Sequence, residues 1–543
     1  MRIPKLAAVV AALLVVVVGS TVVEAAGSGG EAYVTLLYGD EFLLGVRVLG
    51  KSIRDSGSTK HMVVLVSDGV SDHAINLLKA DGWIVDMISL LANPNQVRPT
   101  RFWGVYTKLK IFNMTDYRKV VYLDADTIVV KNIDNLFQCG KFCANLKHSE
   151  RLNSGVMVVE PSAAVFNDMM TKVTTLPSYT GGDQGFLNSY YADFPNAHVF
   201  QPNLPKEVLK SRPVPEMERL STLYNADVGL YMLANKWMVD ESELHVIHYT
   251  LGPLKPWDWW TSWLVKPVDV WQRVRVQLEE SLPGTGGGRN PSDELIVKFL
   301  FFVPLCALLF IYYRYHPQLA RTLCRSSFFD QARQLYNKVR TAGGFGYTGV
   351  PSSSAINSPH KFYNGALSKV PGYLGPASIF TCLLAALVAI AVSFSIVPRQ
   401  VTPWTGMVLM YEWTFAIFSL LFGGFLQMMY LWGKTAAVQG GSPTSHSESS
   451  DYDSEKVHQK PGLNCGFSTW HYWFCMAALA VAVPSLPFIC GISALFVRLG
   501  LMVAVGMILV SFMTYASEHL ATAYFLKGLE DRDSTRTRSS IFC

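Results

Sequence analysis

The sequence predicts an α/β domain with a mostly parallel sheet, followed by a bundle of about five membrane-spanning helices. Strand-like and helical patterns alternate between residues 27 and 281, which is typical of such a sheet. Beyond residue 295 lie long apolar segments, each near the roughly 20 residues that cross a bilayer. They span 296–313, 377–397, 407–432, 467–489 and 499–516. Half of the 543 residues are apolar and 16% are charged, which is more apolar than an ordinary soluble protein.

The two ends of the chain predict its topology. Arg2 and Lys5 precede an apolar run and two small residues, so residues 1–26 are expected to be a signal peptide or an uncleaved anchor. Basic residues gather in the loop after the first span and in the tail 526–543, which predicts that both are cytosolic. The domain 27–281 is then expected in the lumen of the secretory pathway, and a linker 282–295 joins it to the membrane domain 296–525.

The luminal domain begins with strand, helix, strand. Strands are expected at 32–37, 62–66 and 83–88, with a helix at 42–53. No Gly-x-Gly-x-x-Gly follows the first strand and no Walker sequence occurs, which disfavours a dinucleotide dehydrogenase or a P-loop enzyme. The net charge of +5 comes mostly from the predicted cytosolic segments, so it gives no case for a nucleic-acid partner.

The most informative segment is the apolar run 120–130, which carries Asp124 and Asp126. The run predicts a buried parallel strand, and its carboxylates come where the strand leaves the core, the usual ligand edge of an α/β sheet. Two carboxylates there suit Mn²⁺ or Mg²⁺ bridging a diphosphate. The alternative to a metal site is an ordinary turn, because turns are rich in Asp.

Four other polar segments point to the same site. They are a lysine upstream of the run, an Asn-Ser-Gly turn before another apolar strand, a Gly-Gly-Asp-Gln sequence that opens a helix, and a His segment that ends in Lys-Pro-Trp. An imidazole can add a third metal ligand, and a lysine can pair with phosphate. The key residues are Lys108, Asn153, Ser154, Gly155, Gly182, Asp183, Gln184, His248, Gly252 and Lys255.

This ordered set resembles glycosyltransferase family 8, the glycogenin-like retaining transferases of the GT-A fold, over roughly residues 30–270. The resemblance implies a UDP-sugar donor and Mn²⁺ held by Asp124, Asp126 and His248. It also implies that Ala125 and these ten key residues contact the donor, and that the uridine lies at the end of the first strand. The uridine contacts would be Thr35, Leu36, Tyr38 and Phe42.

The chemistry expected of this set uses three residues. Lys255, together with the metal, stabilises negative charge on the departing UDP. Asp183 and Gln184 are the nearest candidates for a nucleophile under the anomeric carbon. Because Gln is a poor nucleophile, a same-face substitution is favoured over a double displacement.

The resemblance also bears on the substrates. Thr180 stands where glycogenin has an acidic residue, which predicts a different sugar selectivity. The spans resemble those of a membrane-embedded plant branch of the family, which implies UDP-glucuronate as donor and the head group of the sphingolipid inositol phosphorylceramide as acceptor. A transferase acting on a cell-wall polysaccharide or a protein, with the spans as anchor, is the main alternative, and a transporter or scaffold is the other.

Three further expectations concern single residues. Arg98, Arg101 or Lys108 would bind the carboxylate of a uronic acid. Glu412 and Arg498 would line the approach of the lipid head group, or else pair within the bundle and snorkel to the interface. Cys139 and Cys143 would form a disulfide or half of a zinc site. The oligomeric state is not predicted.

Overall fold

The computed structural model describes residues 30–94, 104–147, 149–205, 207, 211–252, 254–281, 291–315, 370–439 and 465–539. The signal peptide, Arg98, Arg101 and the long cytosolic loop of the sequence analysis lie outside these residues. The chain divides into two compact units. The first, called the sheet unit, comprises 1–256 and 269–288, and the second, called the helical unit, comprises 257–268 and 289–543.

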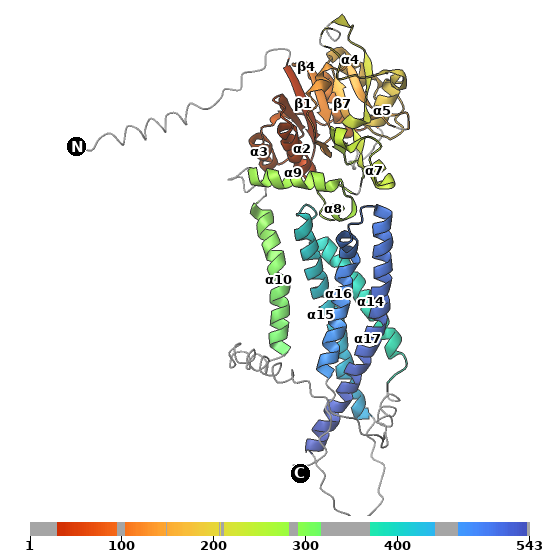
Figure 1. The fold of residues 1–543 in the computed structure, drawn as a ribbon. Coiled ribbons are helices and arrows are strands. Elements are labelled where there is room, and N and C mark those ends of the chain that lie inside the picture. Colours follow the sequence, from red (N-terminus) through yellow and green to blue (C-terminus); the bar gives the residue numbers. More distant parts are fainter. Residues whose placement is uncertain are drawn as a thin grey trace, which may run out of the picture. The chain divides into compact units, whose positions relative to one another are not determined.

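The sheet unit is built on an eight-stranded sheet in the order β3-β2-β1-β4-β7-β6-β9-β8 (Figure 1). Only β7 runs against its two neighbours, and the other pairs are parallel, as the sequence predicts. The strands are β1 (Gly30–Leu37), β2 (His61–Val66), β3 (Ile84–Met87), β4 (Tyr117–Leu123), β6 (Phe142–Leu146), β7 (Leu152–Val159), β8 (His198–Val199) and β9 (Met217–Leu220).

The run 120–130 is not one strand, and this corrects the sequence expectation. It divides at Asp124 into β4 and a short strand β5 (Thr127–Val129), which joins a second sheet in the order β10-β11-β5. The side chain of Thr127 donates to the carbonyl oxygen of Asp124 at 2.7 Å and closes the bend between the two strands. The two carboxylates therefore lie in a turn between sheets. The remaining strands of the second sheet are β10 (Ala226–Asp227) and β11 (Val246–His248).

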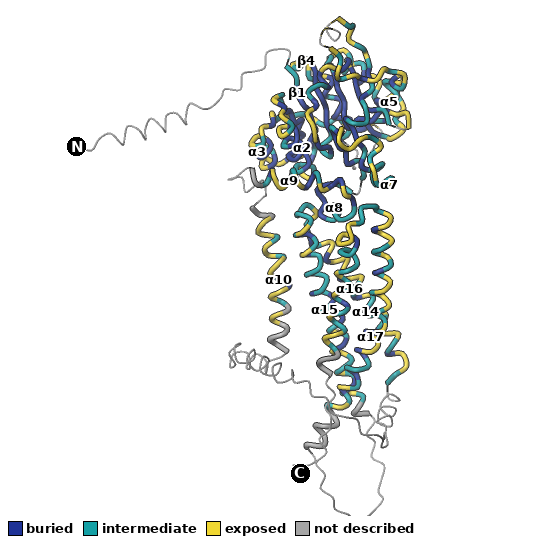
Figure 2. The backbone as a smooth tube through the Cα atoms, viewed as in Figure 1, coloured by how far each residue is buried: buried dark blue, intermediate teal, exposed yellow. Residues whose placement is uncertain are grey.

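Helices cover both faces of the main sheet, because successive strand residues point to opposite faces. Tyr33 and Leu37 of β1 pack with the apolar side of α2 (Leu43–Asp55) and with α3 (Asp72–Ala80). Val34 and Leu36 pack on the opposite face with the 3₁₀ helix η2 (Val105–Asn113), α4 (Ala163–Lys172) and α5 (Asp183–Tyr190). Figure 2 shows the resulting buried centre of the unit. The short helices α7 (Val228–Ala234) and α9 (Val268–Ser281) follow later in the chain.

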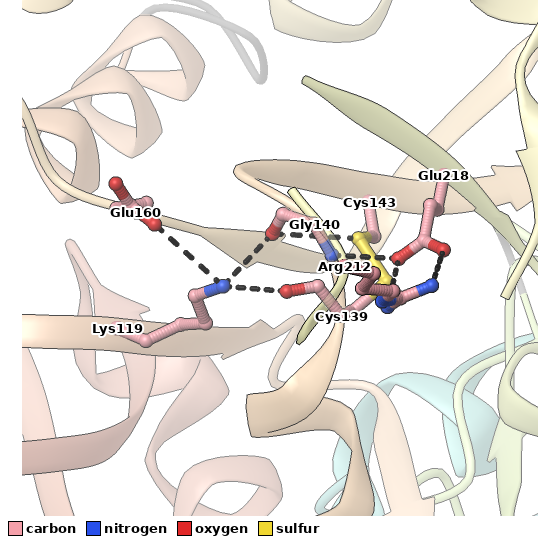
Figure 3. Close-up of a disulfide and its surroundings, with 7 residues drawn as sticks. All are labelled: Lys119, Cys139, Gly140, Cys143, Glu160, Arg212 and Glu218. Atoms are coloured by element: carbon pink, nitrogen blue, oxygen red, sulfur yellow. Dashed lines mark hydrogen bonds and ion pairs between the residues drawn. A yellow bond between two sulfur atoms is a disulfide. The ribbon is translucent and has the colours of Figure 1, made fainter. Parts of the chain in front are cut away.

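Cys139 and Cys143 form a disulfide in the turn that leads into β6 (Figure 3). The buried amine of Lys119 donates to the carbonyl oxygens of Cys139 and Gly140, at 2.5 and 3.0 Å. The carboxylate of Glu218 accepts from the backbone N–H of Gly140 at 2.8 Å and pairs with Arg212. Because burial disfavours its charged form, the pKa of Lys119 lies below its ordinary value. The disulfide thus closes a turn whose backbone groups already have partners.

The helical unit contains four helices long and apolar enough to cross a membrane among the described residues. They match the last four predicted spans, and each begins a few residues before the predicted start. They are α14 (Leu374–Ile396), α15 (Pro403–Gln439), α16 (Cys465–Ile489) and α17 (Leu495–Ser539). The first predicted span coincides with α10 (Pro291–Tyr315), which is not among those four. Because α10 begins at Pro291, the last residues assigned to the linker are helical.

Residues 257–268, called the Trp-rich segment, include the short helix α8 (Thr261–Leu264) and pack within the helical unit. Asp258 pairs with Arg399 at 2.9 Å, and the backbone N–H of Trp259 donates to the carbonyl of Arg399 at 3.0 Å. The ring of Trp259 lies so close to Gly406 that a Cβ there would meet it at 2.3 Å. The tryptophans of this segment are therefore packed against helices of the same unit.

Candidate metal and donor-sugar site

Two carboxylates and an imidazole gather at the turn after β4. One ligand atom from each of Asp124, Asp126 and His248 lies within 4.8 Å of the others. The Nε2 atom of His248 is 3.3 Å from an oxygen of Asp126 and 3.9 Å from one of Asp124. This is a donor set of oxygen and imidazole nitrogen, which suits Mn²⁺ and similar divalent ions. The three residues fit the metal that the sequence implies.

The second sheet brings His248 to the carboxylates, although it is far from them in sequence. His248 ends β11, which pairs antiparallel with β5 so that His248 lies opposite Thr127. The backbone N–H of Tyr249 then donates to the carbonyl of Asp126 at 2.9 Å. The split of the run 120–130 into two strands is therefore what makes a three-ligand site possible.

Two lysines neutralise the carboxylates. Lys108 is buried and lies 2.9 Å from Asp124 and 3.0 Å from Asp183. Burial alone would lower the pKa of Lys108, but those two carboxylates raise it above its ordinary value. Lys255 lies 2.6 Å from Asp126. Burial would raise the pKa of Asp126, yet the charges of Lys255 and His248 and their hydrogen bonds hold it below its usual range.

The Asn-Ser-Gly and Gly-Gly-Asp-Gln segments meet beside this cluster. Asn153, Ser154 and Gly155 are part of β7, so they form the start of the strand and not a turn before it. The side chain of Asn153 donates to the Oε1 atom of Gln184 at 3.0 Å. The hydroxyl of Ser154 donates to Asp183 at 2.9 Å. Asp183 begins α5 as predicted, directly after Gly182.

Asn225 belongs to the site, and sequence reasoning missed it. It is buried, its side chain lies between two residues of the site, and its Oδ1 atom is 2.9 Å from Nδ1 of His248. Its Nδ2 atom donates to Oδ1 of Asn153 at 2.8 Å. When Nδ1 of the imidazole carries the proton, Nε2 is left as the metal-binding atom. Asn225 directly precedes β10, the strand that pairs with the strand of His248, but nothing in the local sequence marks it as part of the site.

Gly155 leaves room for the imidazole of His248. A Cβ at this position would lie 2.0 Å from Cε1 of His248 and 2.6 Å from its Nδ1. The absence of a side chain at Gly155 therefore lets the ring lie against β7. The backbone N–H of Asp124 donates to the carbonyl of the same glycine at 2.9 Å, so one residue contacts two of the three candidate ligands.

The first strand ends at the same edge of the sheet. β1 and β4 are parallel neighbours, so Tyr38, which follows β1, and Asp124, which follows β4, leave the sheet on one side. The rings of Tyr38 and Phe42 lie with centroids 5.4 Å apart. Thr35 and Leu36 are buried within the sheet.

Of the remaining predicted residues, Ala125 lies in the turn between the two aspartates and packs against the core, and Gly252 lies in the loop between His248 and Lys255. Glu412 and Arg498 belong to the helical unit. Among the described residues, neither carboxylate oxygen of Glu412 has a hydrogen-bond partner, although both are shielded from solvent. The guanidinium of Arg498 donates to the carbonyl of Trp263 at 2.9 Å and to that of Ile492.

Comparisons with known proteins identify the family of this chain. The family model described as glycosyl transferase family 8 matches residues 33–141. The chain is 70% identical over 512 residues to inositol phosphorylceramide glucuronosyltransferase 1 of Arabidopsis thaliana, covering 94% of each chain. It is 36% identical over 162 residues to UDP-glucuronate:xylan alpha-glucuronosyltransferase 1 of the same plant, over 30% of this chain and 25% of that one.

Among solved structures, the galactosyltransferase LgtC in complex with donor and acceptor sugar analogs matches with a TM-score of 0.32 and 16% identity, over 45% of this chain and 94% of that one. The relative that is 70% identical is matched over nearly its whole length, and the family model covers the segment with the two metal-site aspartates. The chain is a glycosyltransferase, and it belongs to glycosyltransferase family 8.

Proposed function

We propose that this protein transfers glucuronic acid from UDP-glucuronate to the head group of the sphingolipid inositol phosphorylceramide, with retention of the anomeric configuration. The similarity to an inositol phosphorylceramide glucuronosyltransferase over 94% of both chains supports this substrate pair. The shared length matters, because it includes the membrane helices as well as the transferase domain. The observation that carries the reaction type is the cluster of Asp124, Asp126 and His248.

The metal in this proposal is Mn²⁺, or Mg²⁺ in its place. Asp124, Asp126 and His248 would hold it, and when bound it supplies positive charge that stabilises the departing UDP. Lys255 lies beside Asp126 and extends from the loop after β11, so its ammonium is placed to bind a diphosphate at this cluster. Tyr38 and Phe42, at the same edge of the sheet, would hold the uridine.

The sugar side of the site is formed by Asp183, Gln184 and Asn153. The carboxylate of Asp183 accepts from Lys108 and from the hydroxyl of Ser154, and these two contacts reduce its strength as a nucleophile. The carboxamide of Gln184 is held by Asn153 and Tyr179. These contacts support the same-face substitution, in which the two side chains orient the sugar while the acceptor hydroxyl attacks from the side of the departing UDP.

The acceptor head group would bind in the helical unit near Glu412. A carboxylate with shielded oxygens and no hydrogen-bond partner among the described residues is costly in a membrane helix, which favours a functional role. Hydroxyls of an inositol ring would supply the missing donors. Arg498 is proposed to act differently from Glu412, because its contacts with the carbonyls of Trp263 and Ile492 hold the Trp-rich segment on α17.

The cellular setting completes the proposal. The protein would be a multi-pass protein of the Golgi membrane with its sheet unit in the lumen. The basic loop and tail support this orientation by the positive-inside rule. The disulfide between Cys139 and Cys143 also supports it, because such bonds persist in the oxidising secretory pathway.

The test is a transfer assay with the full chain purified in detergent. The enzyme would receive UDP-glucuronate, UDP-glucose or UDP-galactose with inositol phosphorylceramide, and mass spectrometry would identify the product. The wild type is expected to form glucuronosyl-lipid from UDP-glucuronate, and the Asp126→Asn protein is expected to form none. A parallel reaction with xylan oligosaccharides addresses the alternative acceptor. Transfer to the oligosaccharide but not to the lipid would reject the proposed acceptor while keeping the donor.

A further inference from the structure

A donor that carries a carboxylate needs a cation that a neutral sugar does not need. The lysines that the structure describes around the site already pair with carboxylates of the protein. Lys108 pairs with Asp124 and Asp183, and Lys255 pairs with Asp126. Lys147, which follows β6 at the same edge, pairs with Asp227. A uronate that bound any of these amines would compete with a carboxylate of the protein.

Arg151 differs from those lysines. It directly precedes Leu152, the first residue of β7, and so lies two residues before Asn153. Its side chain is exposed, and none of the described residues forms a hydrogen bond or an ion pair with its guanidinium. The guanidinium carbon lies 3.9 Å from the ring centroid of Tyr179, a cation–π contact that holds the group over the ring. Its N–H donors are thus available to a ligand.

Tyr179 connects this guanidinium to the sugar side of the site. Its hydroxyl accepts from Nε2 of Gln184 at 3.1 Å. The other end of the same carboxamide, Oε1, accepts from Asn153 at 3.0 Å. The guanidinium is therefore separated by one aromatic ring from a carboxamide that is proposed to orient the donor sugar.

Thr180 gives an independent reason to expect an anionic sugar here. Its hydroxyl oxygen accepts from the backbone N–H groups of Gly182 and Gly185, at 3.3 and 3.0 Å. The residue therefore closes the loop before α5 and brings no charge to it. An aspartate or glutamate at this position would repel a sugar carboxylate, and Thr180 carries no such charge.

We propose that Arg151 recognises the C6 carboxylate of the donor sugar and selects a uronic acid over a neutral hexose. The planar guanidinium would bind the carboxylate through two parallel N–H···O bonds while its face stays on Tyr179. This inference rests on the proposed function, since it deepens the choice of UDP-glucuronate as donor.

The test measures the dissociation constants of UDP-glucuronate, UDP-glucose and UDP by calorimetry on the full chain in detergent with Mn²⁺. Arg151→Ala should raise the dissociation constant of UDP-glucuronate by about 10- to 100-fold, the range of a charge-assisted contact. UDP-glucose and UDP should change by less than about twofold, because they lack the carboxylate. Arg151→Lys should recover part of the loss, since a lysine keeps the charge but not the fork.

A matched control is Lys172→Ala. Lys172 also lies over a tyrosine ring, 5.3 Å from the centroid of Tyr190, but its ammonium is paired with Asp168. The Lys172→Ala substitution should leave the dissociation constants of UDP-glucuronate, UDP-glucose and UDP unchanged. Equal losses for both sugar nucleotides in Arg151→Ala, or no loss, would overturn the role of Arg151 while the wild type still prefers UDP-glucuronate. A wild type that binds UDP-glucuronate no better than UDP-glucose would overturn the proposed donor as well.

Discussion

Replacing Gly155 by alanine should weaken metal binding without replacing any of the three candidate metal ligands. The new Cβ would lie 2.0 Å from Cε1 of His248. Carbon atoms in contact are usually 3.5–4.0 Å apart, so the ring has to retreat by roughly 1.5 Å. A metal–ligand bond tolerates about 0.2 Å, so this retreat takes Nε2 out of the coordination sphere.

The expected size of the effect follows from these distances. The Mn²⁺ dissociation constant should rise at least about 10- to 100-fold, the loss typical of a displaced supporting residue. Crowding the core should also cost about 1–3 kcal/mol of unfolding free energy. Mn²⁺ affinity would be measured by calorimetry or by the paramagnetic signal of free ion, and stability by thermal unfolding without metal.

A second glycine of the site provides the control. A Cβ on Gly182 would meet Val105 at 3.5 Å, which is ordinary contact, so Gly182→Ala should keep the Mn²⁺ affinity of the wild type. Because the effect of Gly155→Ala acts through His248, adding it to His248→Ala should cause little further loss. A Gly155→Ala protein that binds Mn²⁺ within about twofold of the wild type would refute the reasoning.

Three other predictions concern groups around the same site. Asn225→Ala should weaken the binding of Mn²⁺ about 10-fold or more, because Nδ1 of His248 loses its partner. The Asn225→Asp protein retains the acceptor oxygen, so calorimetry on it should show most of the Mn²⁺ affinity restored. Excess chelator should abolish transfer by the wild type, and added Mn²⁺ should restore it in the mass-spectrometric assay; activity that persists in chelator would contradict the metal role of Asp126. Burial would raise the pKa of Asp227, but the charge of Lys147 holds it below its ordinary value. The ionised Asp227 therefore stabilises the fold fully above its unfolded pKa of about 3.9. This contribution is lost as the pH falls through the lower pKa of the folded protein. The stability difference between wild type and Asp227→Asn in urea should therefore shrink on acidification, and a constant difference would contradict the ion pair.

The sequence was a good guide where chemistry is carried by short motifs. The alternation of strands and helices gave the parallel sheet, and Asp124, Asp126 and His248 do come together. It failed at the run 120–130, because apolar periodicity does not show that a chain changes sheets after Asp124. The order of the strands decides that, and only long-range pairing with β11 reveals it.

Single supporting residues were the other limit. Asn225 belongs to no recognisable motif, and its role depends on a contact across 72 residues with Asn153. Lys108 was one of three basic residues expected to meet the sugar carboxylate, and the sequence does not disclose that two aspartates already surround it. Contacts of this kind arise from tertiary packing and leave no local pattern.

The place of the Trp-rich segment has a consequence for producing the protein. A soluble fragment ending at residue 281 would keep Trp259, Trp260 and Trp263 but lose the helices they pack on. Three exposed tryptophans of about 150–250 Å² each exceed the apolar patch that a soluble monomer usually tolerates, so such a fragment should aggregate.

Ending the fragment at residue 256 does not solve the problem. Residues 269–281 return to the sheet unit, where the side chain of Gln272 donates to the carbonyl of Pro256 at 2.7 Å. A soluble catalytic domain therefore calls for an internal replacement, in which a short polar linker takes the place of residues 257–267 and α9 is retained.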